Sequence, residues 1–532
     1  MKEISKGKWA MGNGKGPRLF PFPISHGPFT FFLLSAHRTL RSASGPLLSA
    51  FCVLLFSSAC SVGPKYQRPS APVPAAYKEQ LPDNAKGGAE WKPAQPNDGT
   101  VRGKWWEIYN DPQLNALEEQ VSISNQNVLA AEAQFRAAKD AVRIVRSGLF
   151  PTVAALPSIV NTRTSRTLSS KGVINFASGV RTIYNLPVDV SYQADVWGSI
   201  RHSVSASAEA AQVSAAQLEN ARLIFQSELA QDYFQLHGAD SSKDLLERTV
   251  KSYQQYLQLT RNRYNGGVAS GGDVAQAETQ LDTAKAQLID LEVARAQFEH
   301  AIAILIGKPP AALSISSTVL KSPPPPVPAG VPSSLLERRP DIAAAERQMA
   351  AANEEIGIAK AAFYPALILS ASGGLQSSSF LNWLSWPSRF WSVGPQLAQT
   401  LFDAGRRRAQ LAQTQAAYDF TVAGYRQTVL TSFQEVEDNL AALRVLGNEA
   451  SAEDDAVRAS QRSLQISTDQ YKAGTVSYLQ VITSQAIALQ DERAAVDILT
   501  RRMVASVRLV EALGGGWDAT TLPTEQNLIK GK

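Results

Sequence analysis

The chain has 532 residues, two cysteines and a formal net charge of +5. Residues 1–59 hold seven basic residues and one acidic residue, so they carry +6 and the rest of the chain a net charge of −1. The rest therefore offers no basic surface for nucleic acid. Since the two cysteines are Cys52 and Cys60, the chain beyond them can form neither a disulfide framework nor a cysteine-ligated zinc site.

Residues 1–59 have the pattern of a secretory signal. Arg38 and Arg41 precede a short apolar run at residues 47–56, and small residues follow the run. A basic flank, an apolar centre and small residues at a cleavage site are typical of such signals. The run is too short for a membrane-spanning helix, which needs about 20 apolar residues. We therefore expect residues 1–59 to be a signal or leader segment.

Cys60 is the candidate lipid-attachment residue. The stretch Ser57-Ser58-Ala59-Cys60 resembles a lipobox, whose cysteine is acylated and becomes the new N-terminus, although Ser57 stands where leucine is usual. The alternative is a plain signal peptide with an incidental cysteine. By the same resemblance Ser61, in place of aspartate, favours sorting to the outer membrane. Residues 60–102, rich in Pro, Gly and Ala, are expected to form a lipid-anchored extended tether. The lipid on Cys60 is the sole cofactor expected.

The remaining chain is predicted to contain two similar halves. Gly198 and Gly405 are 207 residues apart, as are Tyr264 and Tyr471, whereas Pro151 precedes its counterpart by 214. A constant offset with one seven-residue step indicates an internal duplication of a whole substructure. The predicted boundaries are 103–320 for the first repeat, 321–333 for a Pro-rich linker, 334–516 for the second repeat and 517–532 for a C-terminal tail.

Each repeat is predicted to run helix, strand, strand, long helix, turn and helix. The expected elements, in chain order, are helix 113–147, strands 152–163 and 185–196, long helix 199–265, helix 341–362, strands 366–375 and 391–402, and long helix 406–472. Each long helix lacks Pro and would extend about 100 Å at 1.5 Å per residue. From Val204 to Leu236, apolar residues alternate in steps of three and four, which predicts coiled-coil packing. The fold class is therefore mainly α with a small β part.

The stretch from Asn185 to Trp197 alternates strictly between apolar and polar residues. Such alternation over about 11 residues suits a tilted strand that crosses a bilayer with one face toward lipid and the other toward water. A half-buried strand of a soluble sheet is the alternative. Four strands are too few to close a barrel, and open strand edges are not tolerated in lipid. Other subunits would have to complete the sheet, and three copies would supply about twelve strands.

Several short motifs resemble those of the outer-membrane efflux proteins, the TolC-like channels, and in particular their lipoprotein branch. They are Val62-Gly63-Pro64-Lys65-Tyr66, Trp105-Trp106 with Asp111-Pro112, Asp195-Val196-Trp197-Gly198, Leu335-Leu336-Glu337-Arg338-Arg339-Pro340-Asp341-Ile342, Phe363-Tyr364-Pro365, Leu401-Phe402-Asp403-Ala404-Gly405 and Glu435-Val436-Glu437-Asp438. The resemblance spans about Val62 to Gly516. It implies a homotrimer with a 12-strand transmembrane β-barrel, continued by a 12-helix coiled-coil α-barrel in the periplasm.

The same resemblance implies partners and a localisation. A periplasmic adaptor, or membrane fusion protein, would contact the inner end of the duct and connect it to an inner-membrane pump that supplies the energy. The chain would be lipid-anchored in the cell outer membrane and contact outer-membrane lipid, with no nucleic-acid partner. It would be a passive exit duct for small molecules such as drugs, toxic compounds or metal ions.

The far ends of the long helices are the candidate functional site. Similar channels use these tips as both the closed aperture and the adaptor contact, which implies that role for Gly267, Val268, Ala269, Ser270, Gly474, Thr475, Val476 and Ser477. Simple tight turns are the alternative, since glycine suits an abrupt helix end. Some family members carry charged latch residues at this place, where this chain has Val476 and Ser477, with Asp273 nearby.

No catalytic or metal-binding constellation is recognisable in the sequence, so we expect no enzyme activity and no metal site. The five histidines are isolated, and no glycine loop has the lysine and strand context of a nucleotide site. Glu435, Glu437 and Asp438 are interpreted as a solvated helix face or as inter-helix pairs. Two alternatives to the efflux duct stay open: a type I protein-secretion duct, and a lipid-anchored periplasmic scaffold without a pore.

Overall fold

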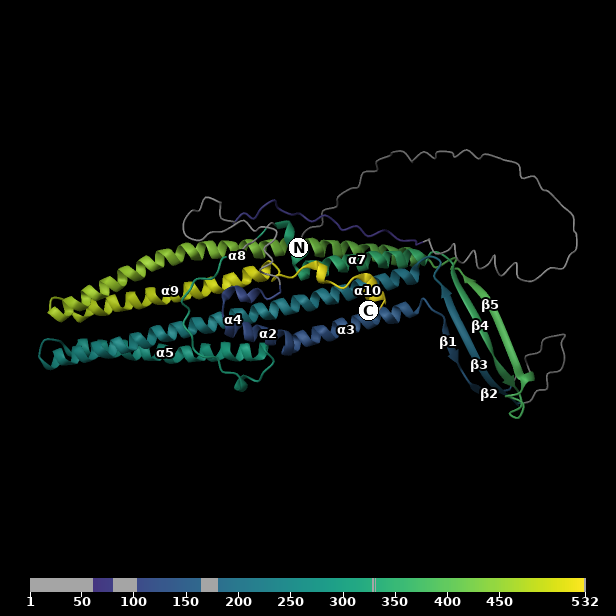
Figure 1. The fold of residues 1–532 in the computed structure, drawn as a ribbon, viewed down its shortest axis with the longest axis horizontal. Helices are drawn as coiled ribbons and strands as arrows, with labels where there is room; N and C mark the ends of the chain where they lie inside the picture. Colours follow the sequence, from purple (N-terminus) through teal and green to yellow (C-terminus); the bar gives the residue numbers. More distant parts are fainter. Residues whose placement is uncertain (1–60, 80–102, 164–179, 328–329, 331, 531–532) are drawn as a thin grey trace, which may run out of the picture. The chain divides into compact units, whose positions relative to one another are not determined.

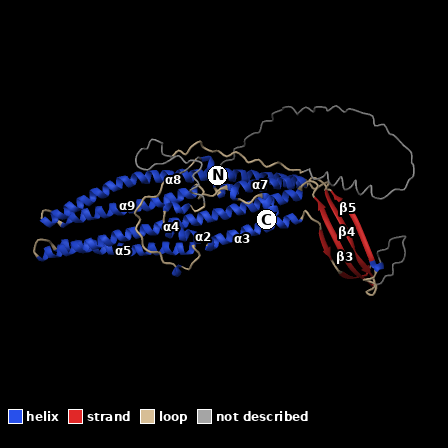
Figure 2. Cartoon of the chain, viewed as in Figure 1, coloured by secondary structure: helices blue, strands red, loops and turns tan. Residues whose placement is uncertain are grey.

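The computed structural model describes residues 61–79, 103–163, 180–327, 330 and 332–530, and these form helices and one small sheet (Figures 1 and 2). Cys60 and the proposed leader lie outside the described residues. The main helices are α2 (Pro112–Ser124), α3 (Gln126–Ser147), α4 (Ser199–Asn265), α5 (Gly271–Leu305), α6 (Leu335–Arg338), α7 (Pro340–Ala361), α8 (Arg406–Ala473), α9 (Tyr478–Ala512) and α10 (Glu525–Lys530).

Two helical hairpins, α4–α5 and α8–α9, make up about half of the described chain. α4 also packs on α9, so the hairpins lie side by side, and α7 packs on both α4 and α8. Most residues of the predicted seam from Val204 to Leu236 are buried, and its polar exceptions, Arg222 and Asp232, are half-buried. The long helices keep their predicted bounds to within a residue because no Pro interrupts them. None of the helices in the described ranges is both long and apolar enough to cross a bilayer.

The helix predicted over 113–147 is wrong in one respect, because it is broken at Asn125. This residue has extended backbone angles, with φ −64° and ψ 122°. Its side-chain oxygen accepts hydrogen bonds from the backbone N–H groups of Asn127 at 2.9 Å and Val128 at 3.1 Å, which starts α3 afresh. Its side-chain nitrogen donates to the carbonyl of Leu305 at 2.8 Å. A tertiary contact to the end of α5 therefore accompanies the break.

The sheet is antiparallel, and its strands pair in the order β1-β3-β4-β5, with β2 also pairing β3. The strands are β1 (Thr152–Ala155), β2 (Ser158–Arg163), β3 (Val180–Ala194), β4 (Ala366–Ser377) and β5 (Arg389–Ala398). β1 and β2 occupy the place predicted for one strand over 152–163. Pro157, which has no N–H to donate, interrupts that strand, and both pieces pair with β3. The sheet thus has four strand positions.

Residues 61–79, here called the N-terminal strap, lie extended against α7 and α8. The hydroxyl of Tyr66 donates to the carboxylate of Glu346 at 2.9 Å, and Arg68 Nε donates to the hydroxyl of Tyr425 at 3.2 Å. The carboxylate of Glu437 accepts the N–H groups of Lys78 and Glu79 at 2.7 and 2.9 Å. From Tyr66 onward, this part of the predicted tether is therefore docked on the second half of the chain.

The start of the strap is held at the junction between the strands and α4. The Ser61 hydroxyl lies 2.8 Å from His202 Nε2, and His202 Nδ1 lies 2.5 Å from a carboxylate oxygen of Glu354. The N–H of Val62 donates to the carbonyl of Trp197 at 3.3 Å. These contacts fix where the residue after Cys60 sits in the fold.

Candidate functional site: the paired helix tips

The eight tip residues named from the sequence lie in the two turns that close the hairpins. Gly267, Val268, Ala269 and Ser270 connect α4 to α5, and Gly474, Thr475, Val476 and Ser477 connect α8 to α9. All are exposed or half-buried, and Val268 is 66% exposed. The two turns lie at the ends of the hairpins distant from the sheet (Figure 1). The sequence prediction thus placed these residues at the right elements, while their role as an aperture stays a prediction.

Glycine is required in both turns by the backbone. Gly267 has φ 75° and Gly474 has φ 81°, in the left-handed region that side chains with a Cβ rarely adopt. The turn after α4 closes with hydrogen bonds from Gly267 N to Tyr264 O and from Val268 N to Arg263 O, both 2.9 Å. The turn after α8 closes with bonds of 3.0 Å from Gly474 N to Tyr471 O and from Thr475 N to Gln470 O. These bonds satisfy the last carbonyls of each long helix.

Asp273 has a local role that its proximity to the tip did not reveal. The Ser270 hydroxyl accepts from Asp273 N at 3.1 Å, and the Asp273 carboxylate accepts from Ser270 N at 2.9 Å. This reciprocal capping box begins α5. The carboxylate is thereby engaged within its own turn, whereas Ser477, at the equivalent place before α9, makes no side-chain cap.

Arg263 joins the two hairpin tips, and the sequence reasoning missed it. From the last turn of α4, its Nη1 atom donates to the carbonyl of Tyr471 at 2.9 Å and to that of Lys472 at 3.3 Å, at the end of α8. Its guanidinium lies 4.6 Å from the centre of the Tyr471 ring. A cation suits the negative end of the α8 dipole and the face of an aromatic ring. The two hairpins are therefore bonded to each other at their tips.

One signal in the sequence could have revealed Arg263. At the offset of 207 that relates the helices of the two halves, its counterpart is Gln470. A charge present in one half and absent from the other marks a contact that the halves do not share. A charged latch at the tip residues themselves was not expected, because Val476 and Ser477 stand there, and Arg263 lies before the tip residues, in the last turn of α4.

A small apolar cluster packs beneath the tips and is separate from the main core. Here called the tip cluster, it consists of Tyr253, Leu257, Ala277, Leu281, Ala284, Tyr471, Tyr478 and Val481. The rings of Tyr471 and Tyr478 lie 5.4 Å apart. Burial raises the pKa of Tyr253 to about 12, with Glu492 on α9 adding to the shift. The cluster draws on α4, α5, α8 and α9, so both hairpins contribute to it.

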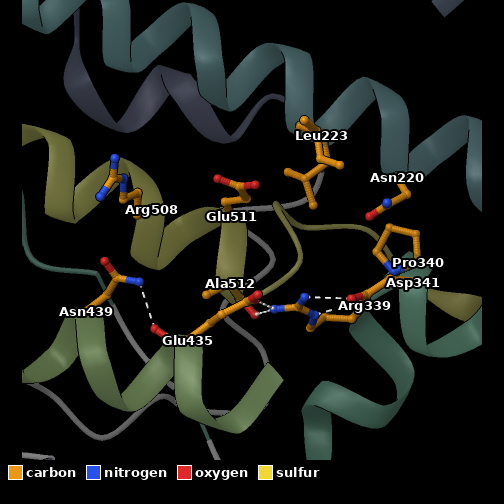
Figure 3. A pocket seen from close by; sticks show the side chains of 11 residues that line it. Asn220, Leu223, Arg339, Pro340, Asp341, Glu435, Asn439, Arg508, Glu511 and Ala512 are labelled. Atoms are coloured by element: carbon orange, nitrogen blue, oxygen red, sulfur yellow. Dashed lines mark hydrogen bonds and ion pairs between the residues drawn. The ribbon is translucent and has the colours of Figure 1, made fainter. Parts of the chain in front are cut away.

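A second site of inter-helix contact lies around Arg339, within the Leu335–Ile342 motif (Figure 3). Arg339 Nη2 lies 2.6 Å from the Asp341 carboxylate, and Nη1 lies 2.6 Å from that of Glu435 and 3.0 Å from the carbonyl of Ala512. These carboxylates raise the pKa of the Arg339 guanidinium above its usual range despite its burial. The ion pair with Glu435 confirms the interpretation of this acidic residue as an inter-helix partner.

The cavity beside Arg339 has a volume of about 320 Å³ and lies between α4, α8 and the end of α9. Two charged residues that line the cavity form hydrogen bonds with other side chains. Glu511 accepts from Ser227 at 2.5 Å, and Arg508 donates to Gln231 at 2.8 Å. Burial raises the pKa of Glu511. These pairings are those of a structural junction between helices.

The chain resembles known proteins over most of its length. The family model described as "Outer membrane efflux protein" matches residues 117–308 and 331–515. The probable efflux pump outer membrane protein TtgC of Pseudomonas putida is 31% identical over 88% of this chain and 96% of its own length. Outer membrane protein OprJ of Pseudomonas aeruginosa is 30% identical, again over 88% and 96%. The solved structure of the outer-membrane channel OprN has a TM-score of 0.78 at 28% identity and covers 86% of this chain and 100% of its own.

Proposed function

The chain belongs to the outer membrane efflux protein family, and from this we propose that it is the passive exit duct of a tripartite efflux pump. Its relatives are outer-membrane components of efflux pumps, and the family is one of transport channels rather than of enzymes. The cargo would be small molecules, delivered by an inner-membrane pump and a periplasmic adaptor. The observation that carries the proposal is the pair of long hairpins whose tips are bonded to each other by Arg263.

A homotrimer is supported by the single chain's sheet. Among the described strands, β5 at one edge and β1 with β2 at the other have partners on one side only. Trp391 and Val393 of β5 are 78% and 73% exposed. Unpaired edges and exposed apolar side chains suit a sheet continued by further copies and covered by lipid. We therefore propose a trimeric 12-strand barrel continued by a 12-helix barrel.

An internal duplication is supported by contacts that recur between the halves. Asn125 Nδ2 donates to the carbonyl of Leu305 at 2.8 Å, and Arg339 Nη1 donates to that of Ala512 at 3.0 Å. Arg339 follows Asn125 by 214 residues, and Ala512 follows Leu305 by 207. The same two offsets that relate the sequence halves thus relate one tertiary contact to its counterpart.

The membrane anchor and the adaptor contact are further parts of the proposal. An acyl chain on Cys60 would attach the start of the strap to the outer membrane, near the junction where Ser61 is held. Val268 in the turn after α4 and Leu479 at the start of α9, 66% and 59% exposed, would contribute apolar surface to an adaptor.

Conductance of the purified protein in planar lipid bilayers tests the duct and its tips. We expect low conductance for the native protein, and an open fraction about five- to tenfold higher for Arg263→Ala, because hydrogen bonds to a charged group that join the hairpins are lost. Arg261→Ala is the matched control. Arg261 lies two residues away and pairs with Glu278 at 2.6 Å within its own hairpin, so its removal should leave the open fraction unchanged.

The alternatives give different results. A chain without conductance in either form would favour the scaffold without a pore. Equal effects of Arg261→Ala and Arg263→Ala would contradict the coupling of the two tips. In cells, loss of the chain should sensitise the bacterium to small toxic compounds, whereas a protein-secretion duct would instead abolish export of a polypeptide.

A further inference from the structure

A layer of polar side chains, all buried except the half-buried Tyr256, lies between the helices just below the tips. Here called the polar layer, it consists of Tyr253, Tyr256 and Thr260 on α4, Ser467, Thr468 and Tyr471 on α8, and Ser484 and Gln485 on α9. Tyr256 and Thr468 are hydrogen-bonded at 3.0 Å, and Ser467 and Ser484 at 2.9 Å. The Tyr471 hydroxyl donates to Thr260 at 3.4 Å. Two of these three contacts cross from one hairpin to the other.

Two members of the layer are buried without hydrogen bonds. Neither the nitrogen nor the oxygen of the Gln485 side-chain amide has a partner within the described part of the chain, and Gln485 is 3% exposed. The hydroxyl of Tyr253, a residue 5% exposed, has no partner there either. Native proteins satisfy nearly all of their buried polar groups, so two such groups in one small layer require an explanation.

The two groups lie on the two helices that pack the hairpins together, Tyr253 on α4 and Gln485 on α9. Gln485 follows Ser484, which bonds to α8, and lies one turn along α9 from Val481 of the tip cluster. Tyr253 is on α4, and the residues of α9 that interact with it electrostatically, Tyr478 and Glu492, lie one on each side of Gln485 in the sequence. The contact between α4 and α9 is the main one that joins the hairpins.

We propose that the polar layer is a built-in device that favours parting of the hairpins, with Gln485 and Tyr253 as the groups that destabilise the closed packing. This inference rests on the proposed duct and concerns its regulation. While the hairpins are packed, both groups are shielded from solvent and lack a partner among the described residues, which is unfavourable. When the hairpins separate, water reaches both groups and the cost disappears. Separation of a fully apolar interface would relieve no such cost. The two unpaired polar groups therefore make separation of these hairpins less unfavourable.

Hydrogen exchange measured by mass spectrometry on the purified full-length protein tests the proposal. Gln485→Met keeps the length of the side chain and removes its polar amide, and Tyr253→Phe removes only the unpaired hydroxyl. Each should slow exchange of the backbone amides in 478–490 by about five- to tenfold, because opening no longer relieves an unpaired polar group. Both should also lower the open fraction of the Arg263→Ala protein in bilayers.

Matched controls separate this effect from general changes in packing. Tyr256→Phe, three residues along the same helix, removes a hydroxyl that is bonded to Thr468, so it should speed exchange rather than slow it. Gln490→Met changes an exposed glutamine of α9 and should have no effect. Unchanged or faster exchange in both Gln485→Met and Tyr253→Phe would overturn the proposal. If instead no form conducts but the exchange results are as expected, the proposed duct function is contradicted. The role of the polar layer in favouring separation of the hairpins is then still supported.

Discussion

At the scale of single residues, some charged side chains connect one helix to another part of the chain. Glu435 and Glu437 lie two positions apart on α8, yet one pairs with Arg339 of the motif before α7 and the other accepts backbone N–H groups of the strap. Arg263 and Arg261 likewise lie two positions apart, and only Arg263 reaches the other hairpin. Neighbouring charges on one helix thus serve different partners because successive positions face different directions.

Arg339→Met should be among the more destabilising single changes at the helix junction. It would leave Asp341, Glu435 and the carbonyl of Ala512 without their common donor. Breaking a buried ion pair costs about 3–5 kcal/mol, and we expect roughly 2–3 kcal/mol here because the Glu435 side chain is 46% exposed. Thermal unfolding in detergent measures the change. Arg338→Met, at the exposed neighbouring position, is the control, and equal losses from both would contradict the junction role.

At the scale of elements, each long helix begins with the same device. The Asp195 carboxylate accepts from Ile200 N and Arg201 N, both at 2.9 Å, before α4. Before α8, the Asp403 carboxylate accepts from Arg407 N at 3.3 Å and pairs with Arg407 Nε at 2.6 Å. A carboxylate satisfies the free N–H groups at a helix start and favours its positive end. The chain can therefore turn directly from strand to helix.

Removing one of these carboxylates should loosen the start of its helix. We expect Asp195→Ala to cost about 1–2 kcal/mol and Asp195→Asn less, because the amide oxygen still accepts. The measurement is hydrogen exchange of the amides in 199–205, which should speed up by about tenfold in Asp195→Ala. Ser199→Ala alters the first residue of α4, which follows the N-cap residue Gly198, and should leave these amides unaffected. Exchange in Asp195→Ala that is as slow as in Ser199→Ala would contradict the capping role of Asp195.

Helices and turns were predictable from the sequence where nearby residues determine the backbone conformation. A stretch without Pro defined the two long helices, and glycine at positions needing positive φ marked the tips. The break at Asn125 was not predictable, because it accompanies a bond to Leu305, 180 residues away. Arg263 was missed for the same reason: its partner carbonyls on α8 are 208 and 209 residues distant. A carbonyl acceptor leaves no trace in side-chain identity, so the partners of Asn125 and Arg263 could not be read from the sequence, although the unmatched charge of Arg263 could have singled it out.

At the scale of the whole molecule, one experiment tests both assembly and attachment. Native mass spectrometry of the detergent-purified protein should give the mass of three chains, because the sheet of one chain leaves edges to be paired. Denaturing the same sample should release a chain that starts at an acylated Cys60. A single-chain mass under conditions that preserve conductance would contradict the trimer, and an unmodified N-terminus at another residue would contradict the anchor.

The docked strap has a consequence for the order in which the chain folds. Arg68 bonds to Tyr425 and Lys78 to Glu437, contacts that span 357 and 359 residues. At about 5–20 residues per second, synthesis reaches those partners on the order of tens of seconds after the strap itself has been made. The first described segment of the chain must therefore wait for the second hairpin, and its docking would be among the last steps of folding. A docked strap would therefore show that this part of α8 has been made and has folded.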